Sequence, residues 1–398
     1  MQTIGRYKIR HEIGQGALAV VYSASDPILK REVALKVLHP IFSKNRQNIE
    51  RLKQEALTLA QLKHPNIIHI YEFIDEPEIK GIVTEYIQGQ TLAQFLERHA
   101  TVAPEISALI VADILSALEH AHSKKIIHRD IKPQNIIINI DGEIKLADFS
   151  IAKIMDKECL TLTGQLIGSP FFMSPEQANG GKIDERSDIF TTGILLYHLI
   201  TGRLPFAGED QKVILKKIIE TSFEHPRKLN SEIPEQLENI VLKALVREKE
   251  KRYQKAWEFR YDLLKYLQHQ EISDEDISLG LFFKNPDQFM EGFKSRRIAL
   301  LSKKAKTAFE KQNYGEASEI WNRILDYDPN NREVHKELKK LSLSRGLKKA
   351  KPVAIVALSL LAIGGIALFL QPDREPLSPR PVTPASQPAL PSMTRHST

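Results

Sequence analysis

The hydrophobic pattern changes type between the first 80 residues and the rest of the chain. The first part contains runs of β-branched residues, which favour strands, and one helical stretch among them. The expected strands are 6–13, 19–25, 32–38 and 67–74, and the helical stretch is 48–62. From Thr91 onward a helical period dominates, with expected helices at 106–123, 189–201, 211–220, 234–246 and 256–268. A small sheet-rich part followed by a larger helical part predicts a two-lobed α+β fold.

Size and cysteine content narrow the class of protein. The 398 residues, 42% of them hydrophobic, suffice for a core and for two or three domains. Cys159 is the single cysteine of the sequence, which excludes a disulfide framework and suits a reducing compartment. The first ten residues contain no apolar run, so no signal peptide is predicted.

The net charge of +6 is unevenly distributed along the chain. Residues 296–351 contain fifteen basic and seven acidic residues, whereas residues 1–295 contain 38 basic and 41 acidic residues. The basic excess therefore lies beside an apolar segment at 353–370 and not on the main body of the chain. This placement favours an anionic membrane surface over nucleic acid as the partner.

The first motif with chemical meaning is a glycine-rich turn between two expected strands. It reads Ile13-Gly14-Gln15-Gly16 and continues to Val21, and Ala34-Leu35-Lys36 follows on the next strand. Glycines at such a turn let backbone amides approach phosphate oxygens, and a lysine on the next strand can reach them too. The motif is weak by itself, because Gly-x-Gly is common at hairpin turns.

A second motif is far more specific. It reads His128-Arg129-Asp130-Ile131-Lys132-Pro133-Gln134-Asn135, and Asp148-Phe149-Ser150 follows thirteen residues after Asn135. Together with the glycine turn, Lys36 and Ser174-Pro175-Glu176, this order resembles the eukaryotic-type (Hanks-type) serine/threonine protein kinases in the form found in bacteria. The resemblance covers residues 7–268, which we therefore expect to be a protein kinase domain.

The resemblance implies ATP and Mg²⁺ as cofactors and assigns roles to individual residues. Asp130 is expected to orient the substrate hydroxyl and to accept its proton. Asn135 and Asp148 would supply oxygen ligands to Mg²⁺, which bridges the nucleotide phosphates. Lys36 would hold the α and β phosphates. Glu55, on the first helical stretch, would form the ion pair with Lys36 that marks the active state.

The nucleotide is expected between the two lobes, with its adenine between apolar side chains of both. Backbone groups of Glu85 and Ile87 would read the edge of the adenine, and Thr84 would be the gatekeeper. The apolar residues of this slot also belong to the ordinary core, and the two roles do not exclude each other. The expected ATP-binding residues are Ile13, Gly14, Gln15, Gly16, Ala17, Leu18, Ala19, Val20, Val21, Ala34, Lys36, Glu85, Ile87 and Ile137.

The substrate class follows from Lys132. In the family, a lysine two residues after the catalytic aspartate belongs to serine/threonine kinases and contacts the transferred phosphate. Ser169 falls where the family usually has threonine, and its hydroxyl could contact Asp130 and Lys132. Proteins with serine or threonine hydroxyls are therefore the expected substrates.

The resemblance also implies regulatory and structural residues. Arg129 offers a guanidinium to a phosphorylated activation loop, and Thr161 and Thr163 are the expected phosphosites. The alternative is that these are two ordinary solvated loop threonines. Three residues resemble structural parts of the large lobe, namely the helix-anchoring Asp188 and the buried pair of Glu176 and Arg252.

Two positions depart from the family pattern. Ala19 replaces the third glycine of the loop, and Ser150 replaces the glycine of Asp-Phe-Gly. Neither glycine contributes a side chain to the chemistry, so we expect effects on rate and regulation more than on activity itself.

Residues 269–295 form an acidic and aromatic connector, and residues 296–345 are expected to be helical. Within 296–345, Ala305, Ala317, Trp321 and Pro329 have the spacing of a tetratricopeptide helix pair, which binds protein partners. Ala308 and Ile324 stand where tyrosine and alanine are typical. A plain amphipathic linker remains the alternative.

Residues 353–370 have no charge and one polar side chain, Ser359. Eighteen helical residues span about 27 Å, close to the ~30 Å hydrocarbon core, which predicts a single transmembrane helix. Lys348, Lys349 and Lys351 precede it, so the kinase domain is expected in the cytoplasm. The proline-rich tail, 372–398, is expected to be disordered and external.

The main alternative function is a pseudokinase scaffold that binds nucleotide and protein partners. The presence of Lys36, Asp130, Asn135 and Asp148 argues against it, because pseudokinases usually lack at least one of them. A small-molecule kinase is disfavoured by Lys132. The sequence leaves open the protein substrate, the activating signal and whether the chain forms a homodimer.

Overall fold

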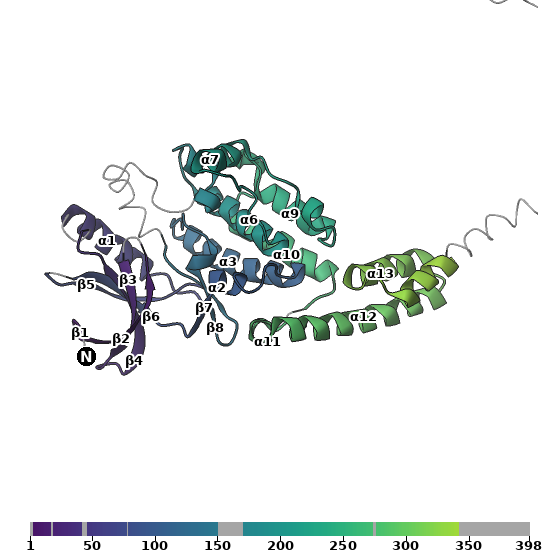
Figure 1. Cartoon of the computed structure of the whole chain (residues 1–398), viewed down its shortest axis with the longest axis horizontal. Helices are drawn as coiled ribbons and strands as arrows, with labels where there is room; N and C mark the ends of the chain where they lie inside the picture. The colour runs from purple at the N-terminus through teal and green to yellow at the C-terminus, as the bar shows by residue number, and fades with distance from the viewer. Residues whose placement is uncertain are drawn as a thin grey trace, which may run out of the picture. The chain divides into compact units, whose positions relative to one another are not determined.

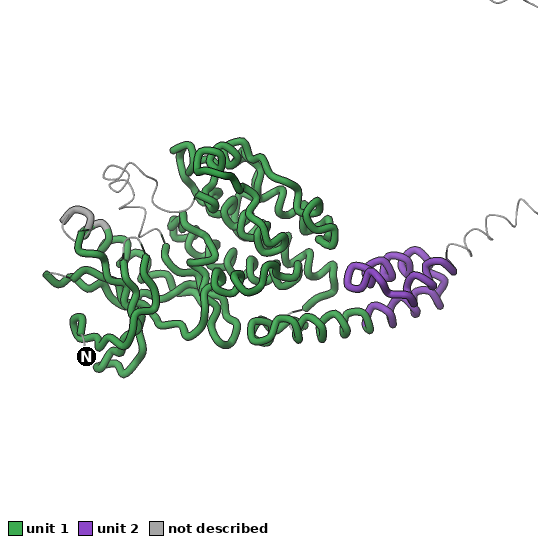
Figure 2. The backbone as a smooth tube through the Cα atoms, viewed as in Figure 1, with its two compact units in different colours: residues 1–299 green, residues 300–398 purple. Residues whose placement is uncertain are grey.

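The computed structural model describes residues 3–16, 19–41, 46–77, 79–149, 170–273 and 276–341. The chain divides into two compact units, residues 1–299 and 300–398 (Figure 2). Several predictions lie outside the described residues: Ala17, Leu18, Ser150, Thr161, Thr163, Ser169, the apolar segment 353–370 and the tail 372–398.

The small lobe of unit 1 contains a six-stranded antiparallel sheet and one helix (Figure 1). Its strands follow the order β1-β2-β3-β4-β6-β5. They are β1 (Thr3–Ile4), β2 (Tyr7–Gln15), β3 (Ala19–Asp26), β4 (Arg31–Leu38), β5 (Ile70–Asp75) and β6 (Lys80–Glu85). Helix α1 (Arg46–Leu59) lies between β4 and β5 in the sequence. The sheet and the helix confirm the predicted composition of this lobe.

The alternation of side chains along β4 separates the core from the nucleotide face. Val33 and Leu35 are fully buried in a cluster that includes Tyr7, Ile74 and Val83. Successive side chains of a strand point to opposite faces. The residues between and after them, Ala34 and Lys36, therefore lie on the other face and are only partly buried. That face carries the predicted phosphate-binding lysine.

The large lobe of unit 1 is helical (Figure 1). Its helices are α2 (Leu92–Leu96), α3 (Pro104–Ser123), α5 (Pro175–Ala178), α6 (Glu185–Thr201), α7 (Gln211–Glu220), α8 (Pro226–Leu229), α9 (Glu235–Ala244) and α10 (Ala256–His269). Nearly every residue of α6 from Ser187 to Ile200 is buried. A helix that is apolar on most of its faces belongs in the middle of a lobe. Helix α6 ends at Thr201 and is capped by Gly202, whose φ of 69° lies in the left-handed region that glycine permits.

A second, three-stranded sheet carries the segment around the predicted catalytic loop. It pairs β7 (Gly89–Thr91) with β8 (Ile136–Asn139) and β8 with β9 (Ile144–Leu146), and its strands were not predicted. The loop after α1 joins it, because the Leu146 amide donates to Asn66 O at 2.8 Å and the Ile68 amide donates to Leu146 O at 3.0 Å. The segment between α1 and β5 is therefore hydrogen-bonded to β9 of this sheet.

The residues predicted as a connector pack on the large lobe. Helix α11 (Leu279–Lys284) places Phe282 and Phe283 against Phe95 of α2, with ring centroids 5.7 and 4.9 Å apart. Helix α12 (Pro286–Glu310) follows, and its buried Arg297 donates to the Glu271 carbonyl at 2.9 Å. Unit 1 accordingly extends to residue 299, beyond the predicted domain end at 268.

Unit 2 contains the end of α12, helix α13 (Tyr314–Tyr327) and a helical stretch at 332–341. Its core includes side chains that the tetratricopeptide spacing singled out. Ala305 and Ala317 are fully buried, and Trp321 is nearly so and lies 5.6 Å from the Phe309 ring. The pair formed by α12 and α13 therefore buries an apolar seam.

The predicted helices agree closely with the observed ones, and α7 has the predicted bounds. Strand β6 was missed because its six residues, Lys80–Glu85, show no strict alternation of polar and apolar positions. No helix among residues 3–341, as far as the structure describes them, has the length and apolar character needed to cross a membrane. The apolar segment 353–370 lies outside the described residues.

Candidate active site

Lys36 and Asp148 bring the two lobes together at the centre of the site. Lys36 lies on β4, and its Nζ donates to Asp148 Oδ1 at 2.7 Å. Asp148 has a φ of 59°, an uncommon left-handed conformation for a residue with a side chain. Desolvation alone would raise the pKa of Asp148, but the Lys36 ammonium holds it below the usual range. The carboxylate is therefore ionised and able to ligate a cation.

Glu55 does not form the predicted ion pair in this structure. It lies on α1 and is half-buried, while Lys36 pairs with Asp148 instead. Within the described part of the chain, Glu55 Oε2 is buried without a hydrogen-bond partner. Burial raises the pKa of Glu55 to about 7, and the positive charge of Arg129 opposes this only in part. Lys36 is thus paired with Asp148 and not with the predicted partner Glu55.

The catalytic loop brings three predicted residues into direct contact. Lys132 Nζ lies 2.8 Å from Asp130 Oδ2. Asn135 Nδ2 donates both to Asp130 O, at 2.8 Å, and to Asp130 Oδ2, at 2.9 Å. The Asp130 carboxylate is therefore held by an ammonium group and an amide on one of its oxygens, which fixes its direction.

The predicted metal ligands are neighbours in space. The Ala147 amide donates to Asn135 O at 2.8 Å. Asp148 is the next residue after Ala147, so this hydrogen bond brings it close to Asn135. Because Asn135 Nδ2 is used on Asp130, its Oδ1 is the atom that could face a cation. Two protein oxygens suit Mg²⁺, which usually takes its remaining ligands from water and phosphate. The described residues contain no cluster of three or more His, Cys, Asp or Glu side chains suited to a metal.

Asp188, from α6, anchors the backbone before the catalytic aspartate. It is fully buried and accepts hydrogen bonds from the amides of His128 and Arg129, each at 2.8 Å. His122 Nε2 lies 2.8 Å from the same carboxylate. Burial alone would raise the pKa of Asp188, but these contacts keep it lowered and the group charged. The predicted structural role of Asp188 agrees with this geometry.

The second predicted structural pair is also present. Arg252 NH1 and NH2 donate to the two carboxylate oxygens of Glu176, at 3.0 and 3.1 Å. Both side chains are buried, and Ser187 Oγ donates to Glu176 as well. The pair joins the start of α5 to the segment before α10 and fixes the large lobe below the site.

The nucleotide residues show a common pattern of exposure. Val21, Ala34, Ile87 and Ile137 are partly exposed, and Ile13 is 44% exposed. Their strand neighbours Val33, Leu35, Ile136 and Ile138 are buried. Apolar side chains left partly open on one face of each lobe suit a planar apolar ligand such as adenine. The glycine turn is closed by the Gly16 amide, which donates to Ala19 O at 2.8 Å.

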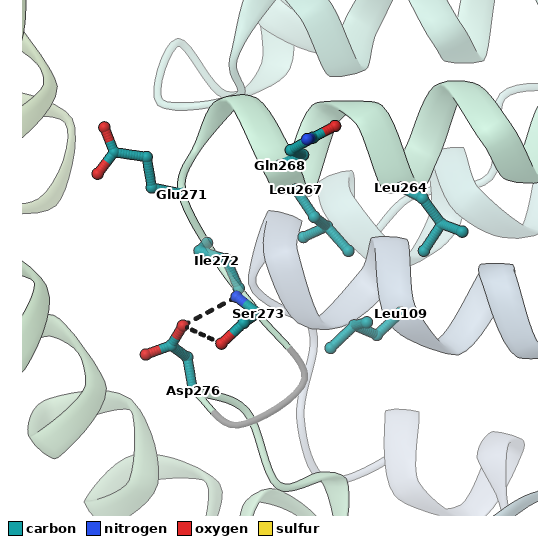
Figure 3. Close-up of a pocket in the computed structure, with 8 residues that line it drawn as sticks. All are labelled: Leu109, Leu264, Leu267, Gln268, Glu271, Ile272, Ser273 and Asp276. Carbon is teal, nitrogen blue, oxygen red and sulfur yellow. Dashed lines mark hydrogen bonds between the residues drawn. The ribbon is translucent and has the colours of Figure 1, made fainter.

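A cavity of about 460 Å³ lies elsewhere in the large lobe (Figure 3). It is lined by Leu109, Leu264, Leu267, Gln268, Glu271, Ile272, Ser273 and Asp276. None of these belongs to the predicted nucleotide or catalytic set. Asp276 is used locally, since it accepts hydrogen bonds from Ser273 N and Oγ at 2.8 Å. We assign this cavity no part in the chemistry.

Sequence reasoning gave no role to His128, which the structure places at the centre of the loop. Its ring is fully buried, lies 4.4 Å from the Phe149 ring, and contacts Ala147 O through Nε2 at 2.9 Å. Burial lowers the pKa of His128, so the ring is neutral. The available signal was its position two residues before Asp130.

Comparisons with known proteins agree with this geometry. The family model described as "Protein kinase domain" matches residues 7–342. Serine/threonine-protein kinase PrkC of Bacillus subtilis is 40% identical over 259 residues, which are 65% of this chain and 40% of that protein. Serine/threonine-protein kinase PknB of Mycobacterium leprae is 36% identical over 265 residues, which are 65% of this chain and 43% of that protein. The matched part thus spans about two-fifths of each relative.

Two solved structures resemble this one. The Mycobacterium tuberculosis PknI kinase domain has a TM-score of 0.54 at 22% identity, covering 66% of this chain and 96% of that one. This likeness shows the shared two-lobed fold. Rad53 in complex with AMP-PNP has a TM-score of 0.55 at 27% identity and covers 64% of each chain.

Proposed function

The chain belongs to the protein kinase family, and we propose that it transfers the γ-phosphoryl group of ATP to serine or threonine hydroxyls of proteins. One observation carries this proposal: Asp130 is held by Lys132 and Asn135 at 2.8–2.9 Å, beside the Lys36–Asp148 contact. The names of PrkC and PknB, both serine/threonine-protein kinases, support the same substrate class.

In the proposed mechanism the protein positions the reactants and neutralises charge. Asp130 accepts the proton of the substrate hydroxyl through Oδ1, because Lys132 and Asn135 both contact Oδ2. Lys132 remains close enough to contact the phosphoryl group as it moves. Lys36 leaves Asp148 to hold the α and β phosphates. Asn135 and Asp148 would hold Mg²⁺, which supplies positive charge to the phosphate oxygens.

The Lys36–Glu55 ion pair is expected in the active state of the kinase. Because Lys36 pairs with Asp148 instead, we infer that this structure is an inactive arrangement. A buried carboxylate oxygen without a hydrogen-bond partner, such as Glu55 Oε2, costs free energy, so a pair with Lys36 would relieve it. Arg129 is close enough to influence the charge of Glu55. We propose that phosphorylation at Thr161 or Thr163 draws Arg129 toward the activation loop and favours the Lys36–Glu55 pair.

We further propose that residues 353–370 anchor the protein in a membrane as a single transmembrane helix. The support is the uncharged run of eighteen residues and the lysines that precede it. The kinase domain would then be cytoplasmic and the tail 372–398 external. Protease treatment of intact cells that carry a C-terminal epitope tag tests this. Survival of the tag, while other external tags are cut, would contradict the topology.

For unit 2 we propose a tetratricopeptide-like helix pair that binds a protein partner. The support is the burial of Ala305, Ala317 and Trp321 at the predicted seam. No observation supports the pseudokinase alternative, because the site contains all four residues that a kinase needs: Lys36, Asp130, Asn135 and Asp148.

The activity itself is tested with Asp130→Asn. Loss of the general base lowers the rate of phosphoryl transfer, and we expect about a 10³-fold fall in kcat for autophosphorylation. Unchanged thermal unfolding would show that the fold persists. If Asp130→Asn and wild type incorporate phosphate equally, the kinase proposal is wrong.

A further inference from the structure

The side chain of Gln177, on α5, joins two segments of the site. Its Oε1 accepts the Ser174 amide at 2.9 Å, and the Gln177 amide donates to Ser174 Oγ at 3.4 Å. These two bonds form a capping box at the start of α5. Its Nε2 points the other way and donates to Arg129 O at 2.9 Å. A single amide group thus spans from the cap of α5 to the catalytic loop.

The carbonyl that Gln177 holds belongs to the peptide group directly before Asp130. The N–H of this peptide group, the Asp130 amide, donates to His128 Nδ1 at 3.2 Å. Both polar atoms of the Arg129–Asp130 peptide are therefore bonded to side chains, which fixes the plane of that peptide. The direction in which the Asp130 side chain leaves the backbone depends on this plane.

The conformation of Arg129 explains why such support is needed. Its φ of 67° is left-handed, a conformation that costs free energy for a residue with a side chain. Asp188 holds the amide of Arg129 at 2.8 Å on one side, and Gln177 holds its carbonyl on the other. An uncommon backbone conformation persists only where its surroundings determine it from several directions.

We propose that Gln177 is a positioning residue that orients Asp130 for catalysis by fixing the Arg129–Asp130 peptide, an inference that rests on the proposed kinase function. Helix α5 follows the predicted phosphosites Thr161 and Thr163 in the sequence. The Gln177–Arg129 bond therefore also connects the chain after these threonines with the residue that precedes the catalytic aspartate.

A glutamine side chain is required at position 177 because its Oε1 accepts one hydrogen bond and its Nε2 donates another. Glutamate at this position of a capping box would accept the Ser174 amide equally well, and its negative charge is favourable at a helix N-terminus. A carboxylate has no N–H, however, so its second oxygen would oppose the Arg129 carbonyl oxygen. Gln177→Glu consequently keeps the helix cap and removes the contact with the catalytic loop.

The chain contains a matched control in α2. Gln94 forms the same capping box with Thr91, since its Oε1 accepts the Thr91 amide at 2.9 Å and its own amide donates to Thr91 Oγ1 at 3.1 Å. Gln94 is exposed, whereas Gln177 is partly buried against the loop. Gln94→Glu makes the same chemical change without touching Arg129.

The experiment compares Gln177→Glu, Gln177→Ala and Gln94→Glu with wild type in the full chain. We expect Gln177→Glu to lower kcat about tenfold, with KM for ATP and for a serine peptide within twofold of wild type. Its melting temperature should stay within about 2 °C of wild type, because the cap is kept. Gln177→Ala should lower kcat similarly and also lose stability. Gln94→Glu should leave kcat unchanged.

A second readout does not depend on activity. Hydrogen–deuterium exchange of the peptide 128–135 should become faster in Gln177→Glu, because the Asp130 amide loses its fixed geometry, and should be unchanged in Gln94→Glu. A kcat within twofold of wild type in Gln177→Glu, an equal fall in Gln94→Glu, or unchanged exchange would each overturn the proposal. Absence of activity in wild type would instead overturn the proposed function, and exchange would still test the contact.

Discussion

The catalytic loop and the region around Lys36 differ in how fully their charged groups are paired. At the loop, Asp188 of α6 accepts three hydrogen bonds, and Asp130 is held by Lys132 and Asn135. In the small lobe, Lys36 pairs with Asp148, and a buried oxygen of Glu55 has no hydrogen-bond partner. The contacts that hold Asp130 and Asp188 in the large lobe are therefore already formed, whereas the Lys36–Glu55 pair of the small lobe is not.

This difference suggests where regulation acts. Carboxylates held by several hydrogen bonds, as Asp130 and Asp188 are, have one favoured arrangement, while the unpaired oxygen of the half-buried Glu55 leaves a second arrangement within reach. Movement of α1, which carries Glu55, would change the partner of Lys36, while Lys132 and Asn135 hold Asp130 from within the large lobe. Control of the enzyme would thus be exerted on the small lobe, and the large lobe would supply the fixed frame.

The largest expected effect comes from breaking the frame of the large lobe with Arg252→Met. This leaves Glu176 buried without its bidentate partner, so we expect the free energy of unfolding to fall by about 3–5 kcal/mol. Urea denaturation followed by tryptophan fluorescence measures it. The control is Lys255→Met, which removes an ion pair with Glu185 from a side chain that is 53% exposed and should cost about 0–1 kcal/mol. Equal losses in both would contradict the role of the buried pair.

An intermediate effect is expected when ATP analogue and Mg²⁺ bind. Phosphates compete with Asp148 for Lys36, and at 100 times Kd the ligand should stabilise the protein by about 2.7 kcal/mol. Hydrogen exchange of α1, residues 46–59, should slow more than that of the loop 128–135, because the loop is already held. Lys36→Met should weaken the slowing in α1. Uniform slowing in both segments would remove the contrast between the lobes.

The sequence predicted the loop far better than it predicted the small-lobe contact. Asp130, Lys132 and Asn135 lie within six residues, so a short local motif determines which side chains meet. The partner of Lys36 depends instead on how α1 packs on the sheet, and local pattern carries no information on that. Phe282 illustrates the same limit, since its contact, Phe95, lies far away in the sequence and residues 269–295 were read only as a connector.

The smallest expected effect concerns the pH dependence caused by Glu55. The folded state raises its pKa from 4.5 to about 7 through burial, so between these values the folded protein holds a proton that the unfolded chain releases. Stability from this group is therefore present at low pH and is lost as pH rises through about 7. Glu55→Gln removes the ionisation and should gain stability relative to wild type between pH 5 and pH 7.5. Because the side chain is half-exposed, the gain should be on the order of 1 kcal/mol or less.

Urea denaturation at several pH values measures this gain in the free energy of unfolding. Glu50→Gln, on the exposed side of the same helix, controls for the change in net charge. A difference between Glu55→Gln and wild type that stays constant with pH, or that shrinks as pH rises, would show that Glu55 is not the strained group of the small lobe.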